Sequence, residues 1–110
     1  MQLIDLKKML SSKLLELVRN DLTKLTDDEI LANALYYAAD FVQDLLGETS
    51  SGLAEQIILL MVEFNLYHRY GYIDDASKVM EQVNKLLDYA GGVHIESDAI
   101  TFDDDELEKW

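Results

Sequence analysis

The sequence contains no cysteine and no proline, few basic residues and no long apolar run. Without cysteine there is neither a disulfide framework nor a thiolate metal site, which is compatible with a reducing compartment. The longest apolar run, Ile57 to Val62, is far too short to span a bilayer. The N-terminal MQLIDLKKML places an acid and two lysines among apolar residues, which is not typical of a signal peptide. These absences predict a soluble protein with no membrane segment.

The scarcity of lysine and arginine leaves the chain strongly acidic. It has 22 acidic and 9 basic residues and a net charge of −13. Residues 91–110 carry seven acids and one lysine, a net charge of −6, which leaves −7 for the first ninety residues. Because phosphate backbones repel such a surface, ordinary nucleic-acid binding is disfavoured and a basic protein partner is favoured.

Length and glycine placement indicate the domain organisation. A chain of 110 residues, 49% of them hydrophobic, is long enough for one core but not for two. The five glycines fall between segments of helical periodicity, where helix ends are expected. We predict an all-α protein, with a small four-helix bundle over residues 1–90 and an acidic docking arm over residues 91–110.

Apolar periodicity places the four predicted helices. The first covers about residues 3–19, and the pattern leaves a break near Ser11-Ser12 open. The second begins at the capping box Thr26-Asp27-Asp28-Glu29 and continues to Gly47. The third, about residues 51–70, is apolar on nearly every side and is therefore expected at the centre of the bundle. The fourth covers about residues 74–90, and short connections predict antiparallel neighbours.

The last twenty residues combine acids with apolar side chains. If Ser97-Asp98 forms a two-residue turn, Ile95 lies opposite Ile100 and Val93 opposite Phe102, on one face of a short β-hairpin. An extended arm is the alternative. Asp103 and Glu106 then have capping-box spacing ahead of Leu107 and Trp110, so a short terminal helix and plain disorder both remain open for the last residues. The predicted partner-binding residues are Val93, Ile95, Ile100, Phe102, Leu107 and Trp110.

A search for catalytic or metal-binding motifs returns little. His68 and His94 have no cysteine nearby and no metal-binding helical spacing, and His68 at a helix end is explained by the helix dipole. The acidic run Asp103–Glu106 lacks the alternating ligands and central glycine of a calcium loop. Tyr67, Tyr70 and Tyr72 are expected to cluster where the third and fourth predicted helices meet. We expect no cofactor, no metal and no enzymatic activity.

The free energy available to the arm limits how it binds. Burying Ile95, Ile100, Phe102 and Trp110 contributes on the order of 2 kcal/mol each. Ordering some twenty residues costs about 1–2 kcal/mol apiece. An arm that docks must therefore be partly preformed, gain backbone hydrogen bonds by strand addition, or act in many copies in a symmetric assembly.

The order of these parts resembles the small head–tail connector proteins of tailed bacteriophages, also called adaptor or head-completion proteins. The resemblance extends from about Leu22 to Ile95. It consists of LTKLTDDEILANALYYAADFVQDLLG, then LAEQIILLMVEFNLYHRYGY, then ASKVMEQVNKLLDYAGGVHI. Relatives often carry an arginine-tyrosine and proline-rich loop between the second and third helices, which here is shortened to GETSSG.

The resemblance implies a virion protein that assembles in the host cytoplasm. It implies a homo-oligomeric ring, typically of twelve copies, between the portal protein and the tail or stopper proteins. Such a ring extends the DNA channel, and its negative charge lets DNA slide through without specific binding. Extended terminal segments of relatives commonly contact the portal or neighbouring subunits.

Two other classes of function fit the sequence. A small chain with a charge of −13 is also typical of an acidic inhibitor that mimics DNA and blocks a nucleic-acid enzyme, as anti-CRISPR proteins do. A regulatory four-helix module that binds one host protein is the third reading.

Overall fold

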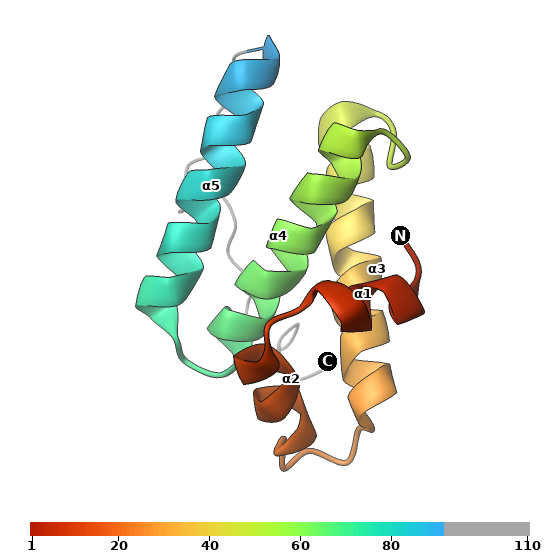
Figure 1. Cartoon of the computed structure of the whole chain (residues 1–110), viewed down its shortest axis with the longest axis vertical. Helices are drawn as coiled ribbons and strands as arrows, with labels where there is room; N and C mark the ends of the chain where they lie inside the picture. Colours follow the sequence, from red (N-terminus) through yellow and green to blue (C-terminus); the bar gives the residue numbers. More distant parts are fainter. Residues whose placement is uncertain (92–110) are drawn as a thin grey trace.

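The computed structural model describes residues 1–91, and this part contains five α-helices and no strand (Figure 1). The helices are α1 (Leu3–Met9), α2 (Ser12–Arg19), α3 (Asp27–Leu46), α4 (Gly52–Arg69) and α5 (Ile73–Gly91). The all-α prediction is confirmed, but the number of helices in the bundle is five rather than four. The predicted hairpin or arm lies outside the described residues.

The extra helix arises because the predicted first helix breaks at Leu10-Ser11. Both residues adopt an extended backbone, with ψ angles of 148° and 153°. The Ser11 hydroxyl then accepts a hydrogen bond from the backbone N–H of Leu14, at 3.3 Å. A serine side chain readily accepts a hydrogen bond from a backbone N–H in the first turn of a helix. Ser11 therefore caps a new helix instead of continuing the preceding one. Leu6, Leu10 and Leu14, which lie before, at and after the break, are all buried in the core.

The predicted ends of α3 are confirmed at the level of individual hydrogen bonds. The Thr26 hydroxyl accepts from the N–H of Glu29 at 3.2 Å, and the Glu29 carboxylate accepts from the N–H of Thr26 at 3.4 Å. This is the reciprocal capping box. At the other end Gly47 has a φ of 76°, a left-handed conformation that glycine adopts without strain, and its N–H donates to the carbonyl of Gln43.

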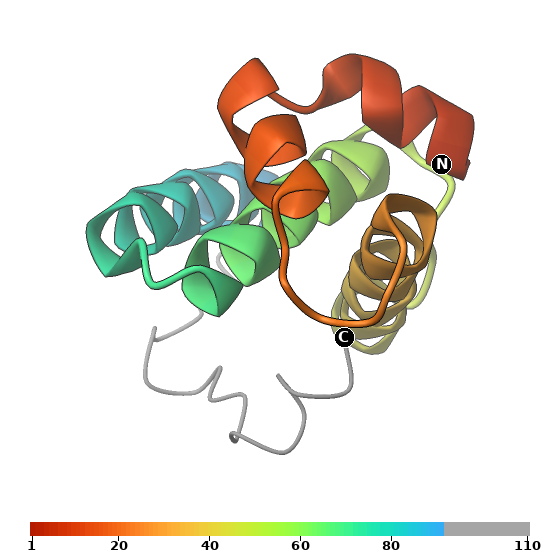
Figure 2. The same ribbon diagram turned by 90° about the horizontal axis from the view of Figure 1, so that it is seen from below.

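Helix α4 lies at the centre of the molecule, as predicted. It packs against α3 on one side and α5 on the other, and these three helices run antiparallel in sequence order (Figure 1). The short helices α1 and α2 lie across one face of this layer (Figure 2). Most of the length of α4 is buried, through its residues Ala54, Ile57, Ile58, Met61, Val62, Phe64, Asn65 and Leu66.

Helix α5 starts one residue before the predicted start and continues to Gly91, one residue past the predicted end. Its buried residues are Ala76, Val79, Met80, Val83 and Leu87, which follow the predicted three-four spacing. Among the described helices, none combines the length and the apolar character that a lipid bilayer requires.

The capping box yields a first prediction. Replacing Thr26 with alanine removes the side-chain acceptor for the first turn of α3 and is expected to lower the free energy of unfolding by about 1 kcal/mol. Urea denaturation followed by circular dichroism measures the change. Thr49→Ala in the α3–α4 loop is the matched control and is expected to change stability by less than about 0.5 kcal/mol. Equal effects from the two substitutions contradict the capping argument.

Candidate functional site

The six predicted partner-binding residues, Val93, Ile95, Ile100, Phe102, Leu107 and Trp110, all lie outside the described residues, so their role stays a prediction. The acidic run Asp103–Glu106 and His94 lie there too. Within the described part, two sets of polar contacts lie at the end of the bundle that carries the α2–α3 and α4–α5 loops, and a pocket lies where α1 and α2 meet α3.

A buried ion pair joins the two loops. The Nε of Arg69, the last residue of α4, donates to Oδ2 of Asp21 in the α2–α3 loop at 2.9 Å. The side chains of Asp21 and Arg69 are only 4% and 7% exposed. The hydroxyl of Tyr70 donates to the same Asp21 oxygen at 2.6 Å. The guanidinium of Arg69 also lies 5.8 Å from the ring centre of Tyr70.

Thr23 completes this arrangement, which we call the Asp21 network (Asp21, Thr23, Arg69 and Tyr70). The backbone N–H of Thr23 donates to Oδ1 of Asp21 at 2.8 Å. A terminal nitrogen of Arg69 contacts the Thr23 hydroxyl at 3.4 Å. Both oxygens of the Asp21 carboxylate are therefore hydrogen-bonded, which is the condition under which a buried charge is tolerated.

The network changes the proton affinity of two of its members. Burial alone raises the pKa of Asp21, but hydrogen bonds from Arg69, Tyr70 and Thr23 outweigh burial and hold that pKa well below its usual range. Burial, together with the hydrogen bond to the Asp21 carboxylate and its charge, raises the pKa of Tyr70. At neutral pH the network therefore contains a charged Asp21, a charged Arg69 and a neutral tyrosine. It can hold a loop rigidly but offers no group poised to transfer a proton near pH 7.

The predicted cluster of Tyr67, Tyr70 and Tyr72 at the α4–α5 corner is confirmed for Tyr67 and Tyr72 only. The rings of Tyr67 and Tyr72 lie edge to face with centres 6.4 Å apart. Lys13 from α2 reaches over Tyr72, with its Nζ 4.5 Å from the ring centre, and forms an ion pair with Asp75 at 3.3 Å. A cation over an aromatic face is attracted by the ring's quadrupole, so this contact attaches α2 to the corner. Tyr70 turns instead to Asp21.

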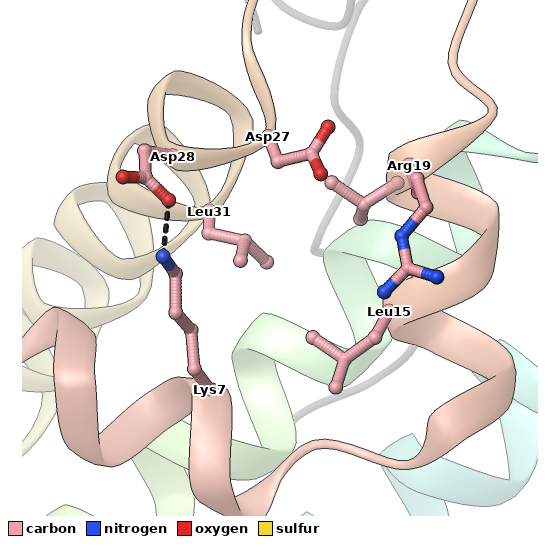
Figure 3. Close-up of a pocket in the computed structure, with 7 residues that line it drawn as sticks. Lys7, Leu15, Arg19, Asp27, Asp28 and Leu31 are labelled. Carbon is pink, nitrogen blue, oxygen red and sulfur yellow. Dashed lines mark ion pairs between the residues drawn. The ribbon is translucent and has the colours of Figure 1, made fainter.

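A pocket of about 230 Å³ lies where α1 and α2 meet the start of α3 (Figure 3). Lys7 and Arg19 reach it from α1 and α2, and Asp27 and Asp28 from α3. Lys7 and Asp28 form an ion pair across it. Its apolar lining comes from Leu15, Val18 and Leu31. The four charges balance, and the described residues hold no group of three or more His, Cys, Asp or Glu placed to bind a metal ion.

Two polar side chains on α4 stand apart from these contacts. Asn65 is 1% exposed, and within the described part of the chain neither atom of its amide has a hydrogen-bond partner. Glu63 is half-buried, and burial raises the pKa of its carboxyl group. His68, near the end of the helix, lies 5.8 Å from Phe64 between ring centres. Its place in the last turn agrees with the helix-dipole reading.

Sequence reasoning did not find the Asp21 network. Its two charged members, Asp21 and Arg69, are 48 residues apart in the chain, and neither belongs to a sequence motif. The one available signal was that Asp21 and Arg69 each lie at the end of a predicted helix. That position does not determine which other residue each of them contacts. Comparison of the chain with family models, with curated proteins and with solved structures found no match.

The Asp21 network yields a prediction about stability and pH. Asp21→Asn leaves the buried Arg69 charge without its partner and is expected to lower the free energy of unfolding by about 3 kcal/mol at pH 7. Because the pKa of Asp21 is depressed in the folded state, this stability is present above the unfolded pKa of about 4 and is lost as the pH falls below it.

Urea denaturation of both proteins at pH 7, 5, 4 and 3 measures the difference. The difference in the free energy of unfolding between wild type and Asp21→Asn is expected to stay constant from pH 7 to 5 and to become smaller below pH 4. Asp40→Asn, on the exposed face of α3, is the control and is expected to have a small effect throughout. If this difference in unfolding free energy stays the same below pH 4, the assignment of a charged Asp21 is contradicted.

The amide of Asn65 yields a third prediction. Burying an unpaired amide costs about 1–3 kcal/mol, and leucine has nearly the same shape. Asn65→Leu is therefore expected to raise the free energy of unfolding by about that amount. Asn33→Leu on the half-buried side of α3 is the control, with an expected change of about 0.5 kcal/mol or less. A loss of stability in Asn65→Leu, measured by urea denaturation, contradicts this reading.

Proposed function

We propose that this chain is a structural assembly protein, a head–tail connector subunit that forms a ring between the portal and the tail or stopper proteins of a tailed bacteriophage. The observation that carries the proposal is the order of helices. A capped helix (α3), a central apolar helix ending in aromatics (α4) and an amphipathic helix closing on glycine (α5) follow one another as the resemblance implies. In this proposal the helical bundle is the rigid body through which the subunit contacts other proteins.

The surface of the described part supports a role in protein contacts. Several large apolar side chains are exposed, including Leu22 at 100%, Tyr89 at 96% and Tyr36 at 68%. Single exposed apolar residues are ordinary, and these three stand on different elements, so each offers a separate contact point rather than part of one apolar patch. Tyrosine is moreover enriched in protein interfaces.

An acidic DNA mimic remains the second candidate, because one observation favours it. Between Lys24 and Arg69 there are eight carboxylates and neither lysine nor arginine. Asp40 and Asp44 of this stretch are exposed on α3, and Glu55 on α4 is also exposed. A DNA mimic is expected to bind a basic nucleic-acid enzyme, such as an RNA-guided nuclease, in competition with DNA and only at low salt.

Co-expression with the portal protein of the same phage tests the connector proposal. The full chain is expected to co-purify with the portal as a ring, visible by electron microscopy and retained in high salt. A full chain that stays monomeric with the portal present contradicts the proposal. Nuclease binding that is displaced by DNA and abolished by salt favours the mimic instead.

Truncation after Gly91 gives a prediction for the arm. The buried core residues that the structure describes form one cluster and all precede Gly91, so the shortened chain is expected to keep its helical circular dichroism and cooperative unfolding. It is expected to lose ring formation, because the predicted partner-binding residues are gone. Unfolding of the truncated chain contradicts the division between bundle and arm near residue 91.

A further inference from the structure

The turn between α4 and α5 brings two tyrosine rings close together. Gly71 has a φ of 82°, the left-handed conformation that glycine adopts without strain. Its N–H donates to the carbonyl of His68 at 3.2 Å, and the N–H of Tyr72 donates to the carbonyl of Tyr67 at 2.8 Å. These two hydrogen bonds are the Schellman ending of an α-helix. The backbone of the turn thus places the rings of Tyr67 and Tyr72 with their centres 6.4 Å apart.

A cation from another helix occupies the space beside these rings. The Nζ of Lys13, on α2, lies 4.5 Å from the ring centre of Tyr72 and 5.6 Å from that of Tyr67. Both distances are within the range over which a ring attracts a cation. The same nitrogen donates to Oδ2 of Asp75, in the first turn of α5, at 3.3 Å. We call Tyr67, Tyr72 and Asp75 the corner site, and the lysine seated there shows that this site accepts a cation.

Lys13 is held in the corner site only weakly. The side chains of Lys13 and Asp75 are 51% and 37% exposed, and Tyr72 is 38% exposed. At such exposed positions an ion pair and a cation–ring contact each contribute little. Helix α2 does not depend on them, because its buried Leu14 and Val18 pack into the core. The Lys13 side chain can therefore leave the corner site while α2 stays in place.

An arginine side chain suits the corner site better than a lysine does. Its planar guanidinium stacks on an aromatic ring and also donates two parallel hydrogen bonds to a carboxylate. The corner site offers the ring of Tyr72 and the carboxylate of Asp75, which both already contact one cation. Arginine is moreover enriched in the buried centres of protein interfaces. A net charge of −13 on the chain further favours the approach of a basic partner.

We propose that the corner site binds an arginine side chain of a partner protein, and that Lys13 occupies this site in the free chain. The arginine displaces Lys13, whose ammonium group returns to water. Lys13 is then an internal competitor, which lowers the apparent affinity of the site by the fraction of molecules in which it is occupied. The corner site is independent of the connector ring, since any protein partner with an exposed arginine can use it.

Removing the internal competitor tests the role of Lys13. The probe is N-acetylarginine methylamide, a single blocked arginine, which is titrated into the full-length protein while NMR follows the ring signals of Tyr67 and Tyr72. Lys13→Met keeps an apolar stem without the charge, and is expected to bind the probe about threefold to tenfold more tightly than the wild type. Lys8→Met, the same change at an exposed lysine on α1, is the matched control and is expected to bind as the wild type does.

Substitutions made in the Lys13→Met chain locate the binding. Asp75→Asn removes the carboxylate partner of the guanidinium and is expected to weaken probe binding about tenfold. Asp74→Asn removes the same charge one position earlier and is expected to change it by less than about twofold. Tyr72→Leu is expected to weaken binding about fivefold, whereas Tyr36→Leu, at an exposed tyrosine on α3, is expected to leave it unchanged.

A blocked lysine, N-acetyllysine methylamide, tests the choice of arginine. It is expected to bind the Lys13→Met chain about threefold more weakly than the blocked arginine, because an ammonium group cannot stack on a ring and is more strongly hydrated. Circular dichroism checks that every variant keeps its helical content.

The outcomes separate the corner site from the proposed function. Equal probe binding by the wild type and Lys13→Met overturns the role of Lys13. Binding that is unchanged in both Asp75→Asn and Tyr72→Leu overturns the location, and stronger binding of the blocked lysine overturns the choice of arginine. A ring on the portal, together with a Lys13→Met chain that binds no arginine, overturns the corner site and leaves the connector proposal standing. Arginine binding by a chain that never associates with the portal supports the corner site alone.

Discussion

Burial of α4 on nearly every side is the constraint on which the rest of the structure depends. Its side chains from Ile57 to Val62 leave no polar face, so no single neighbour can cover them. Helices α3 and α5 flank it, and α1 and α2 close one face of the layer. Helices α1 and α2 meet at the break at Ser11, and each turns a fully buried leucine, Leu6 or Leu14, onto this layer. The buried amide of Asn65, which has no hydrogen-bond partner among the described residues, lies within this packed helix.

Two sets of long-range polar contacts lie at the end of the bundle that carries the α2–α3 and α4–α5 loops. Asp21, Arg69 and Tyr70 join the α2–α3 loop to the end of α4, and Lys13 joins α2 to the tyrosines of the α4–α5 corner. A buried ion pair is weak evidence for stability, because desolvation offsets its attraction. Its consequence here is geometric, since it orders the loop that presents Leu22.

Charge divides the molecule into regions of different character. The segment between Lys24 and Arg69 holds carboxylates without lysine or arginine, and residues 92–110 are denser still in acids. The α2–α3 loop, which carries Lys24, lies at the end of the bundle opposite the last turn of α5 (Figure 1).

Local chemistry in the sequence was enough to determine where most helices begin and end. Thr26 with Glu29, and Gly47, act on backbone groups within four residues, so their effects do not depend on the rest of the fold. The all-round apolar character of α4 likewise determined its central place. The pairing of Asp21 with Arg69 across 48 residues, and the choice of Leu22 rather than another leucine to face solvent, were decided only by the tertiary structure. The pairing and the exposure of Leu22 both depend on which segments pack together in space, and this cannot be predicted from the periodicity of the sequence.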